Sequence, residues 1–181
     1  LQALETAPQA PRPRLELAQL QHRQGQSAQA LTSLQALAQN SPAALPLAAS
    51  LMVEVAEATG EIEPTRALLL RHYEQAPSLD LLQALVALDK KSSQPDAPGR
   101  LRLVNHLERE SSLVAAAQWL EGETLSEEQY HGTVQKALNH ATKPLTRYRC
   151  AACGFEARTH FWHCPGCQSW DSYPARRVEE L

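Results

Sequence analysis

The chain has 181 residues and a formal net charge of −3, which leaves room for one ordinary domain plus a small module. Its 43% of hydrophobic residues exclude a disordered chain, and its slightly acidic balance gives no general signature of nucleic-acid binding. Leu and Ala each occur 28 times, against one Ile and seven Val, so the composition favours helices over a large sheet. All four Cys and six of the nine aromatic residues lie within residues 148–181.

Membrane and secretion signals are absent from the printed sequence. No apolar run reaches the roughly 18 residues needed to cross a bilayer, and no charged and then apolar leader opens the chain. The only Met is Met52 and the chain opens with Leu1. We therefore expect this chain to be a soluble fragment of a longer protein, with room upstream for an anchor or a targeting segment.

A helical pattern begins at Arg14, and its punctuation repeats. Gly25 and Gly60 are 35 residues apart, and Pro42 and Pro77 are also 35 residues apart. A helix, a Gly turn, a second helix and a terminal Pro at a period near 34 residues are typical of tetratricopeptide repeats. Gly suits the tight turn because it tolerates a positive φ, and Pro ends a helix because it lacks an N–H. The alternative is a generic helical bundle with two coincidentally equal spacings.

Further helices are expected beyond the second repeat. A third unit begins at Ser78, and residues 92–99 form a loop. Three more helices follow at about residues 100–109, 113–120 and 126–141, the last capped by Ser126 and Gln129. Helices of this kind bury their faces only by stacking, which leaves a concave surface for a partner and supplies no chemistry of its own. The predicted fold class is mostly α, a tetratricopeptide-like array of helical hairpins (an α-solenoid).

The strongest signal is a pair of Cys-x-x-Cys motifs. Cys150 and Cys153 are followed, after ten residues, by Cys164 and Cys167. Two such turns supply the four thiolate ligands of a tetrahedral site. A pair of disulfides fits badly without a secretion signal, and a thioredoxin-like redox pair needs only one motif. We therefore predict one metal ion bound by Cys150, Cys153, Cys164 and Cys167, with zinc favoured and iron as the alternative.

The residues around the motifs are expected to be structural. Four Cys complete a metal shell, so we interpret His160 and His163 as packing or surface residues. The segment 155–163 is long enough for a short β-hairpin. A module this small depends on its metal for folding. Four aromatic residues are expected to pack around the knuckles or against neighbouring helices rather than to stack on bases: Tyr148, Phe155, Trp162 and Trp170.

A modest excess of positive charge surrounds the Cys motifs. It could contact an acidic partner, anionic lipid headgroups or RNA, with a solvated basic surface as the default. The basic residues outnumber Glu156 and Asp171, and they are Lys143, Arg147, Arg149, Arg158, Arg176 and Arg177.

Helical repeats followed by this C-terminal sequence resemble the lipopolysaccharide assembly protein B family. The matching positions are Arg147-Tyr148-Arg149-Cys150, Cys153-Gly154-Phe155, Trp162-His163-Cys164-Pro165, Cys167 and Trp170. Two features depart from the pattern. Gln168 stands where a rubredoxin electron carrier usually has Gly, and the stretch between Pro77 and Cys150 is long, with an extra apolar helix around Trp119.

The resemblance implies an inner-membrane protein of Gram-negative bacteria. An N-terminal transmembrane helix, absent from this chain, would hold the repeats and a rubredoxin-type module at the cytoplasmic face. The resemblance also implies a regulatory adaptor that restrains lipopolysaccharide synthesis by helping the membrane protease FtsH to degrade the lipid A deacetylase LpxC. A further membrane protein would restrain the adaptor in turn.

We therefore predict a non-enzymatic scaffold in three parts: a linker or frayed end (1–13), helical repeats (14–142) and a rubredoxin-like or zinc-ribbon β module (143–181). The sequence contains no Gly-rich phosphate loop, nucleophile elbow or metalloprotease helix, and a four-thiolate metal has no open position for a substrate. Two alternatives are a rubredoxin-type iron protein that transfers electrons and a zinc ribbon that binds nucleic acid. Nucleic acid is not the favoured partner.

Overall fold

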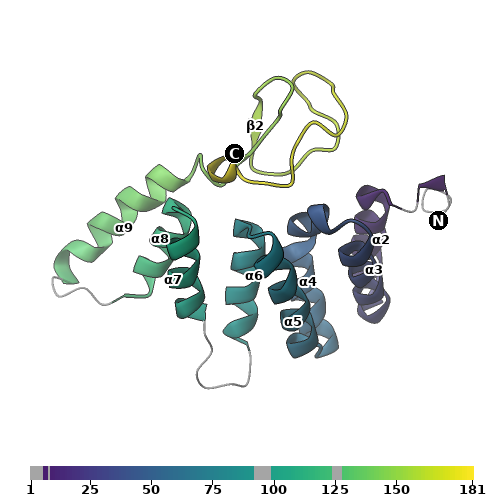
Figure 1. The fold of residues 1–181 in the computed structure, drawn as a ribbon, viewed down its shortest axis with the longest axis horizontal. Coiled ribbons are helices and arrows are strands. Elements are labelled where there is room, and N and C mark those ends of the chain that lie inside the picture. The colour runs from purple at the N-terminus through teal and green to yellow at the C-terminus, as the bar shows by residue number, and fades with distance from the viewer. Residues whose placement is uncertain (1–5, 8, 92–98, 124–127) are drawn as a thin grey trace. The chain divides into compact units, whose positions relative to one another are not determined.

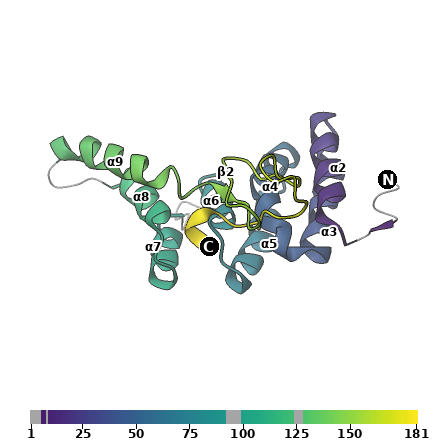
Figure 2. The same ribbon diagram turned by 90° about the horizontal axis from the view of Figure 1, so that it is seen from above.

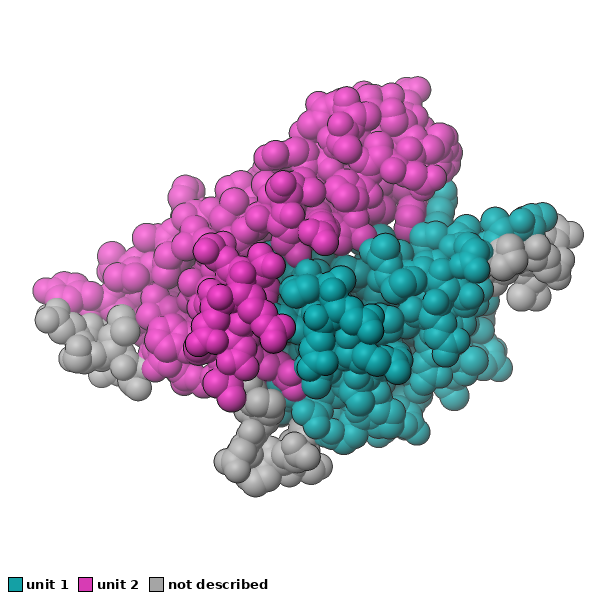
Figure 3. Space-filling view, in the orientation of Figure 1, with its two compact units in different colours: residues 1–97 teal, residues 98–181 magenta. Residues whose placement is uncertain are grey.

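The computed structural model describes residues 6–7, 9–91, 99–123 and 128–181. The chain forms two compact units, residues 1–97 and residues 98–181, which Figure 3 distinguishes by colour. The division predicted between residues 142 and 143 falls inside the second unit and stays a prediction.

The first unit is an array of helices. In chain order these are α2 (Pro11–Arg23), α3 (Ser27–Asn40), the 3-10 helix η1 (Pro42–Ala44), α4 (Leu45–Thr59), α5 (Ile62–Gln75) and α6 (Leu79–Asp89) (Figure 1). Helix α3 packs against both α2 and α4, and α4 also packs against α5 and α6. The predicted fold class, tetratricopeptide-like helical hairpins with a small C-terminal β module, is confirmed.

Glycines and prolines mark the helix boundaries of this array, as the sequence predicts. Gly25 and Gly60 turn the chain between paired helices with nearly the same left-handed conformation, at φ of 77° and 76°. Helices α3 and α5 each end two residues before a proline, Pro42 and Pro77. Helix α2 begins at Pro11, three residues earlier than predicted, because Pro fits the first turn of a helix, where its missing N–H has no partner to lose.

The core of the first unit consists of side chains from α2, α3, α4, α5 and α6. Ala18 and Ala30 are fully buried, as expected of small residues where α2 and α3 pack together. The largest fully buried side chains there are Leu34, Leu37, Leu45, Met52, Val55, Leu69, Leu82, Leu85, Leu88 and Asp89. Because an amphipathic helix buries only one face, this mostly apolar core forms only when the helices stack.

The second unit combines helices with a small β module. The helices are α7 (Gly99–Arg109), α8 (Leu113–Glu121) and α9 (Glu128–Thr142), and α8 packs against both of the others (Figure 2). Strands β1 (Tyr148–Arg149) and β2 (Glu156–Ala157) and the 3-10 helix η2 (Val178–Glu180) complete it. Most of the loop predicted at residues 92–99, and the cap predicted at Ser126, lie outside the described residues. Over the described ranges, no helix has both the length and the hydropathy to cross a bilayer.

The hairpin predicted within residues 155–163 is wrong. Instead, β1 pairs with β2 across the first Cys turn, with Tyr148 opposite Ala157 and Arg149 opposite Glu156. An isolated bridge between His163 and Trp170 spans the second Cys turn in the same way. Each Cys-x-x-Cys turn therefore reverses the chain direction and pairs the residues on its two sides. No separate hairpin forms between the two Cys turns.

Candidate metal centre

Two Cys turns of the same geometry build the site. In each turn the first Cys donates its backbone N–H to the carbonyl oxygen five residues later and accepts from the N–H four residues later. The two bonds measure 2.9 and 2.8 Å at Cys150, and 2.9 and 2.9 Å at Cys164. The residue four positions on is left-handed in both turns, Gly154 at φ 78° and Gln168 at φ 61°. These two bonds close each turn, so that both of its Cys side chains lie on the same turn of the chain.

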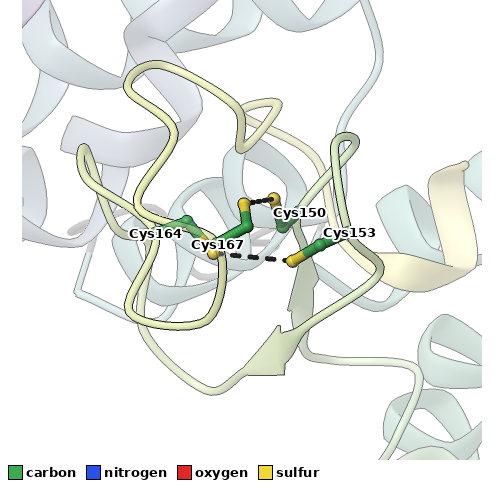
Figure 4. Close-up of side chains that lie close together, drawn as sticks. All are labelled: Cys150, Cys153, Cys164 and Cys167. Atoms are coloured by element: carbon green, nitrogen blue, oxygen red, sulfur yellow. Dashed lines mark hydrogen bonds between the residues drawn. The ribbon is translucent and has the colours of Figure 1, made fainter.

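The four sulfur atoms converge on one point (Figure 4). All four Sγ atoms lie within 4.8 Å of one another. The Sγ atoms of Cys150 and Cys167 are 3.8 Å apart, and those of Cys153 and Cys164 are 3.7 Å apart. A tetrahedron with metal–sulfur bonds of about 2.3 Å has edges of about 3.8 Å, whereas a disulfide needs about 2.05 Å. All four thiols are free. The four predicted residues are thus brought together and are positioned to bind one metal ion.

Hydroxyl and amide groups prepare the sulfurs for the thiolate state. The Cys150 thiol donates to Ser172 Oγ at 3.2 Å, and once the thiol is ionised the hydroxyl donates instead. This contact, with help from the N–H groups of Ala152 and Cys153, lowers the pKa of Cys150 to about 6. In the same way the Ser169 hydroxyl lowers the pKa of Cys167.

Cys153 behaves in the opposite way. The backbone N–H of Phe155 lowers the pKa of this thiol, but desolvation and the hydrogen bonds of the three neighbouring thiols outweigh it and raise the pKa to about 12. Four thiols this close cannot all ionise without a positive charge among them. A divalent metal ion supplies that charge, so the donor set fits a metal better than it fits four free thiols.

Known proteins are similar to this part of the chain. Residues 148–173 match the family described as the rubredoxin metal binding domain. We call the small β module that contains these residues the rubredoxin-type module. The chain is also 50% identical over 36 residues to lipopolysaccharide assembly protein B from Escherichia coli strain K12, and equally so to its counterparts from strains O6:H1 and O157:H7. The aligned segment covers 19% of this chain and only 9% of the length of each relative. The resemblance seen in the sequence is therefore confirmed over the rubredoxin-type module.

Aromatic rings form the small core of the rubredoxin-type module. The His160 ring lies at its centre, with ring centroids 5.6 Å from Tyr148, 4.7 Å from Trp162 and 5.9 Å from Tyr173. His160 Nε2 is 3.0 Å from the Tyr173 carbonyl oxygen, and burial lowers the pKa of this imidazole. His160 therefore packs among the rings of the module, and it is not one of the residues grouped at the sulfur cluster.

The other predicted aromatic residues lie nearer the surface. His163 is exposed and stacks on Trp170 with ring centroids 4.6 Å apart, and Trp170 itself is 61% exposed. Phe155 is 43% exposed and lies where a Cβ at Gly166 would meet it at 3.2 Å. The expected packing around the knuckles thus describes Tyr148 and Trp162 well, whereas Trp170 is mostly exposed to solvent.

Tyr173 is a central residue that the sequence motifs did not single out. Only 5% of it is exposed, and its hydroxyl donates to the Phe155 carbonyl at 3.1 Å. The same hydroxyl oxygen lies 3.9 Å from Cys164 Sγ. Desolvation raises the pKa of Tyr173, and the contact with Cys164 adds a smaller increase. The clue available in the sequence was its position six residues after Cys167, among the last aromatic residues of the chain.

Acidic partners reduce the positive charge expected around the module. Glu156 pairs with Arg149 at 2.8 Å across the two strands and with Arg147 at 3.6 Å. Arg177 lies 4.0 Å above the Tyr148 ring and donates to the Thr146 carbonyl at 2.7 Å. Half of the six predicted basic residues are therefore engaged within the module, which favours the solvated surface over a phosphate-binding patch.

Proposed function

We propose that this chain is part of a regulatory adaptor in the control of lipopolysaccharide biosynthesis, and that it acts by binding proteins rather than by catalysis. The observation that carries the proposal is the 50% identity to lipopolysaccharide assembly protein B across the rubredoxin-type module. The helical array of the first unit supports it, because stacked helical hairpins offer an extended surface to partners.

The family resemblance names the partners to test. On this proposal the chain helps the membrane protease FtsH to degrade the deacetylase LpxC, and a further membrane protein regulates it. We also propose, from the same resemblance, that the protein acts at the cytoplasmic face of the inner membrane.

The metal in this proposal is a structural zinc ion held by Cys150, Cys153, Cys164 and Cys167. Zinc favours four thiolates in tetrahedral geometry and takes no part in redox chemistry. A module with one small ring cluster has little core, so ion binding would supply much of its folding free energy.

Iron is the second candidate, favoured by the match to a domain family named after rubredoxin. A single iron in this site would be a one-electron centre and would colour the oxidised protein. Elemental analysis of protein made with ample iron distinguishes the two. Zinc alone in such a sample would exclude the electron carrier.

The adaptor proposal is tested in cells. We expect the full-length protein to co-purify with FtsH and LpxC, and we expect the double variant Cys150→Ser/Cys153→Ser to lengthen the half-life of LpxC. The matched control is Ala152→Ser, which changes an exposed residue between the same two cysteines. Normal LpxC turnover in the double variant, at equal protein abundance, would show that the metal module has no part in the adaptor's action.

A further inference from the structure

A groove crosses three helices of the first unit. One cavity of about 330 Å³ lies between α2 and α4, and another of about 280 Å³ lies between α4 and α6. Both are lined by Ser50 and Glu54 of α4, so the two cavities adjoin along that helix. The groove therefore runs from α2 over α4 to α6.

Uncharged polar side chains line the groove on all three helices, and Leu51 and Val53 of α4 add apolar surface. Gln19, Ser50 and Gln83 line it from α2, α4 and α6, and they recur 31 and 33 residues apart, close to the repeat period. Ala84 and Ala87 add short side chains at the α6 end. Amide and hydroxyl groups can donate to and accept from a peptide backbone, and short side chains let that backbone come close.

The two ends of the groove differ in charge. His22 and Arg23 line the α2 end, whereas Asp80 lines the α6 end. Glu54 stands between them, 63% exposed, with Oε2 3.9 Å from His22 Nε2. A bound segment would therefore meet a basic side chain at one end and two carboxylates toward the other.

We propose that this groove binds an extended segment of a partner protein that carries an acidic side chain at the α2 end and a basic side chain at the α6 end. The inference rests on the proposed adaptor function and names the kind of partner segment. Packed helices lie about 8–10 Å apart, so three of them span about 20 Å. Five or six extended residues cover that distance at about 3.3 Å per residue. A partner helix would need a continuous apolar groove, whereas seven of the eleven residues that line this one are polar or charged.

Selection of random dodecapeptides displayed on phage against the whole chain tests this proposal. We expect enriched peptides to carry Asp or Glu and, about five residues away in one fixed order, Lys or Arg. By fluorescence anisotropy the best peptide should bind Glu54→Lys about tenfold more weakly, the effect of about 1.4 kcal/mol of lost charge pairing, and should weaken in high salt. Glu74→Lys is the matched control, because it makes the same change of charge on exposed α5 outside the groove.

Three results would overturn the proposal: peptides without a fixed charge order, peptides with an amphipathic helical pattern, or equal binding to Glu54→Lys and Glu74→Lys. Circular dichroism of each variant confirms that the helices are intact. The selection uses this chain alone, so failure of FtsH and LpxC to co-purify would not change its result. Equally, failure of the selection would leave the co-purification untouched.

Discussion

Glu179 and Ser112 lie 67 residues apart in the chain and share a hydrogen bond of 2.8 Å between Ser112 Oγ and Glu179 Oε2. The other carboxylate oxygen accepts from the backbone N–H groups of Leu113 at 2.6 Å and Val114 at 3.1 Å. Ser112 in turn caps α8 by accepting from the Ala115 N–H at 3.0 Å. The C-terminal residues thus bring a negative charge to the positive end of α8 and join the end of the module to the helices of its unit.

Removing this carboxylate should destabilise the second unit. Glu179→Ala leaves the Leu113 and Val114 N–H groups without their acceptor, and the loss of such a cap lowers the free energy of unfolding by about 1–2 kcal/mol. Urea denaturation monitored by Trp fluorescence measures this free energy, because all three Trp lie within residues 98–181. The control is Glu108→Ala at an exposed position of α7, which should leave the free energy of unfolding nearly unchanged. An unchanged midpoint for Glu179→Ala would show that the cap contributes nothing in solution.

The left-handed residues of the two Cys turns make opposite predictions. Gln168 has a Cβ at φ 61°, so Gln168→Gly should raise the stability of the second unit by up to about 1 kcal/mol. Gly154→Ala should lower it by about 1 kcal/mol through backbone strain alone, because no atom lies within 4 Å of the added Cβ. Gly132→Ala, within α9 and equally open, should stabilise by about 1 kcal/mol. The same urea series measures all three variants, and a gain for Gly154→Ala would contradict the turn geometry.

A buried hydroxyl without a hydrogen-bond partner in the described part of the chain lowers the stability of the first unit. Thr65 is 3% exposed, and its Oγ1 has no hydrogen-bond partner among the described residues. Thr65→Val keeps the shape and removes the unsatisfied oxygen, so we expect a gain of about 1 kcal/mol in thermal unfolding followed by far-UV circular dichroism. Thr59→Val is the control, since Thr59 Oγ1 already donates to the Val55 carbonyl at 2.8 Å, and it should bring no such gain. Destabilisation by Thr65→Val would mean that the hydroxyl has a partner in solution.

Acid should weaken the second unit through buried histidines. Burial lowers the pKa of His106 below its usual 6.5, with a smaller opposing effect of the Glu110 and Glu179 carboxylates. The unfolded chain then binds more protons than the folded chain near and below that pH, so the free energy of unfolding falls as the pH falls. His106→Gln should flatten this decline between about pH 7 and pH 5 in urea melts at several pH values. An equally steep decline in the variant would place the acid sensitivity elsewhere, for example at His160.

Sequence reasoning recovered the features that depend on local chemistry. Glycines with positive φ and prolines at fixed intervals set the hairpins of the first unit, and Gly25 and Gly60 adopt the conformation that the spacing required. The four Cys were found because a metal needs them in pairs two residues apart. The clustering of their sulfur atoms follows from those turns.

What the sequence did not reveal depends on contacts between distant residues. Glu179 looks like one more acidic residue near the end of the chain, and only the fold brings it to Ser112. The strand pairing was misplaced for a related reason: the Cys turns themselves reverse the chain, so β1 precedes Cys150 and β2 follows Cys153. The groove over α2, α4 and α6 likewise combines side chains that are more than 30 residues apart.

Metal content is the most direct test of the central claim, that four thiolates hold one ion. Inductively coupled plasma mass spectrometry of the freshly purified chain should find one zinc or iron ion per chain, and Cys164→Ser, which removes a fully buried ligand, should reduce that ratio sharply. Removal of the ion by a chelator should also unfold the rubredoxin-type module, seen as a shift of Trp fluorescence. A chain without bound metal, or a Cys164→Ser variant with undiminished metal content, would contradict the account.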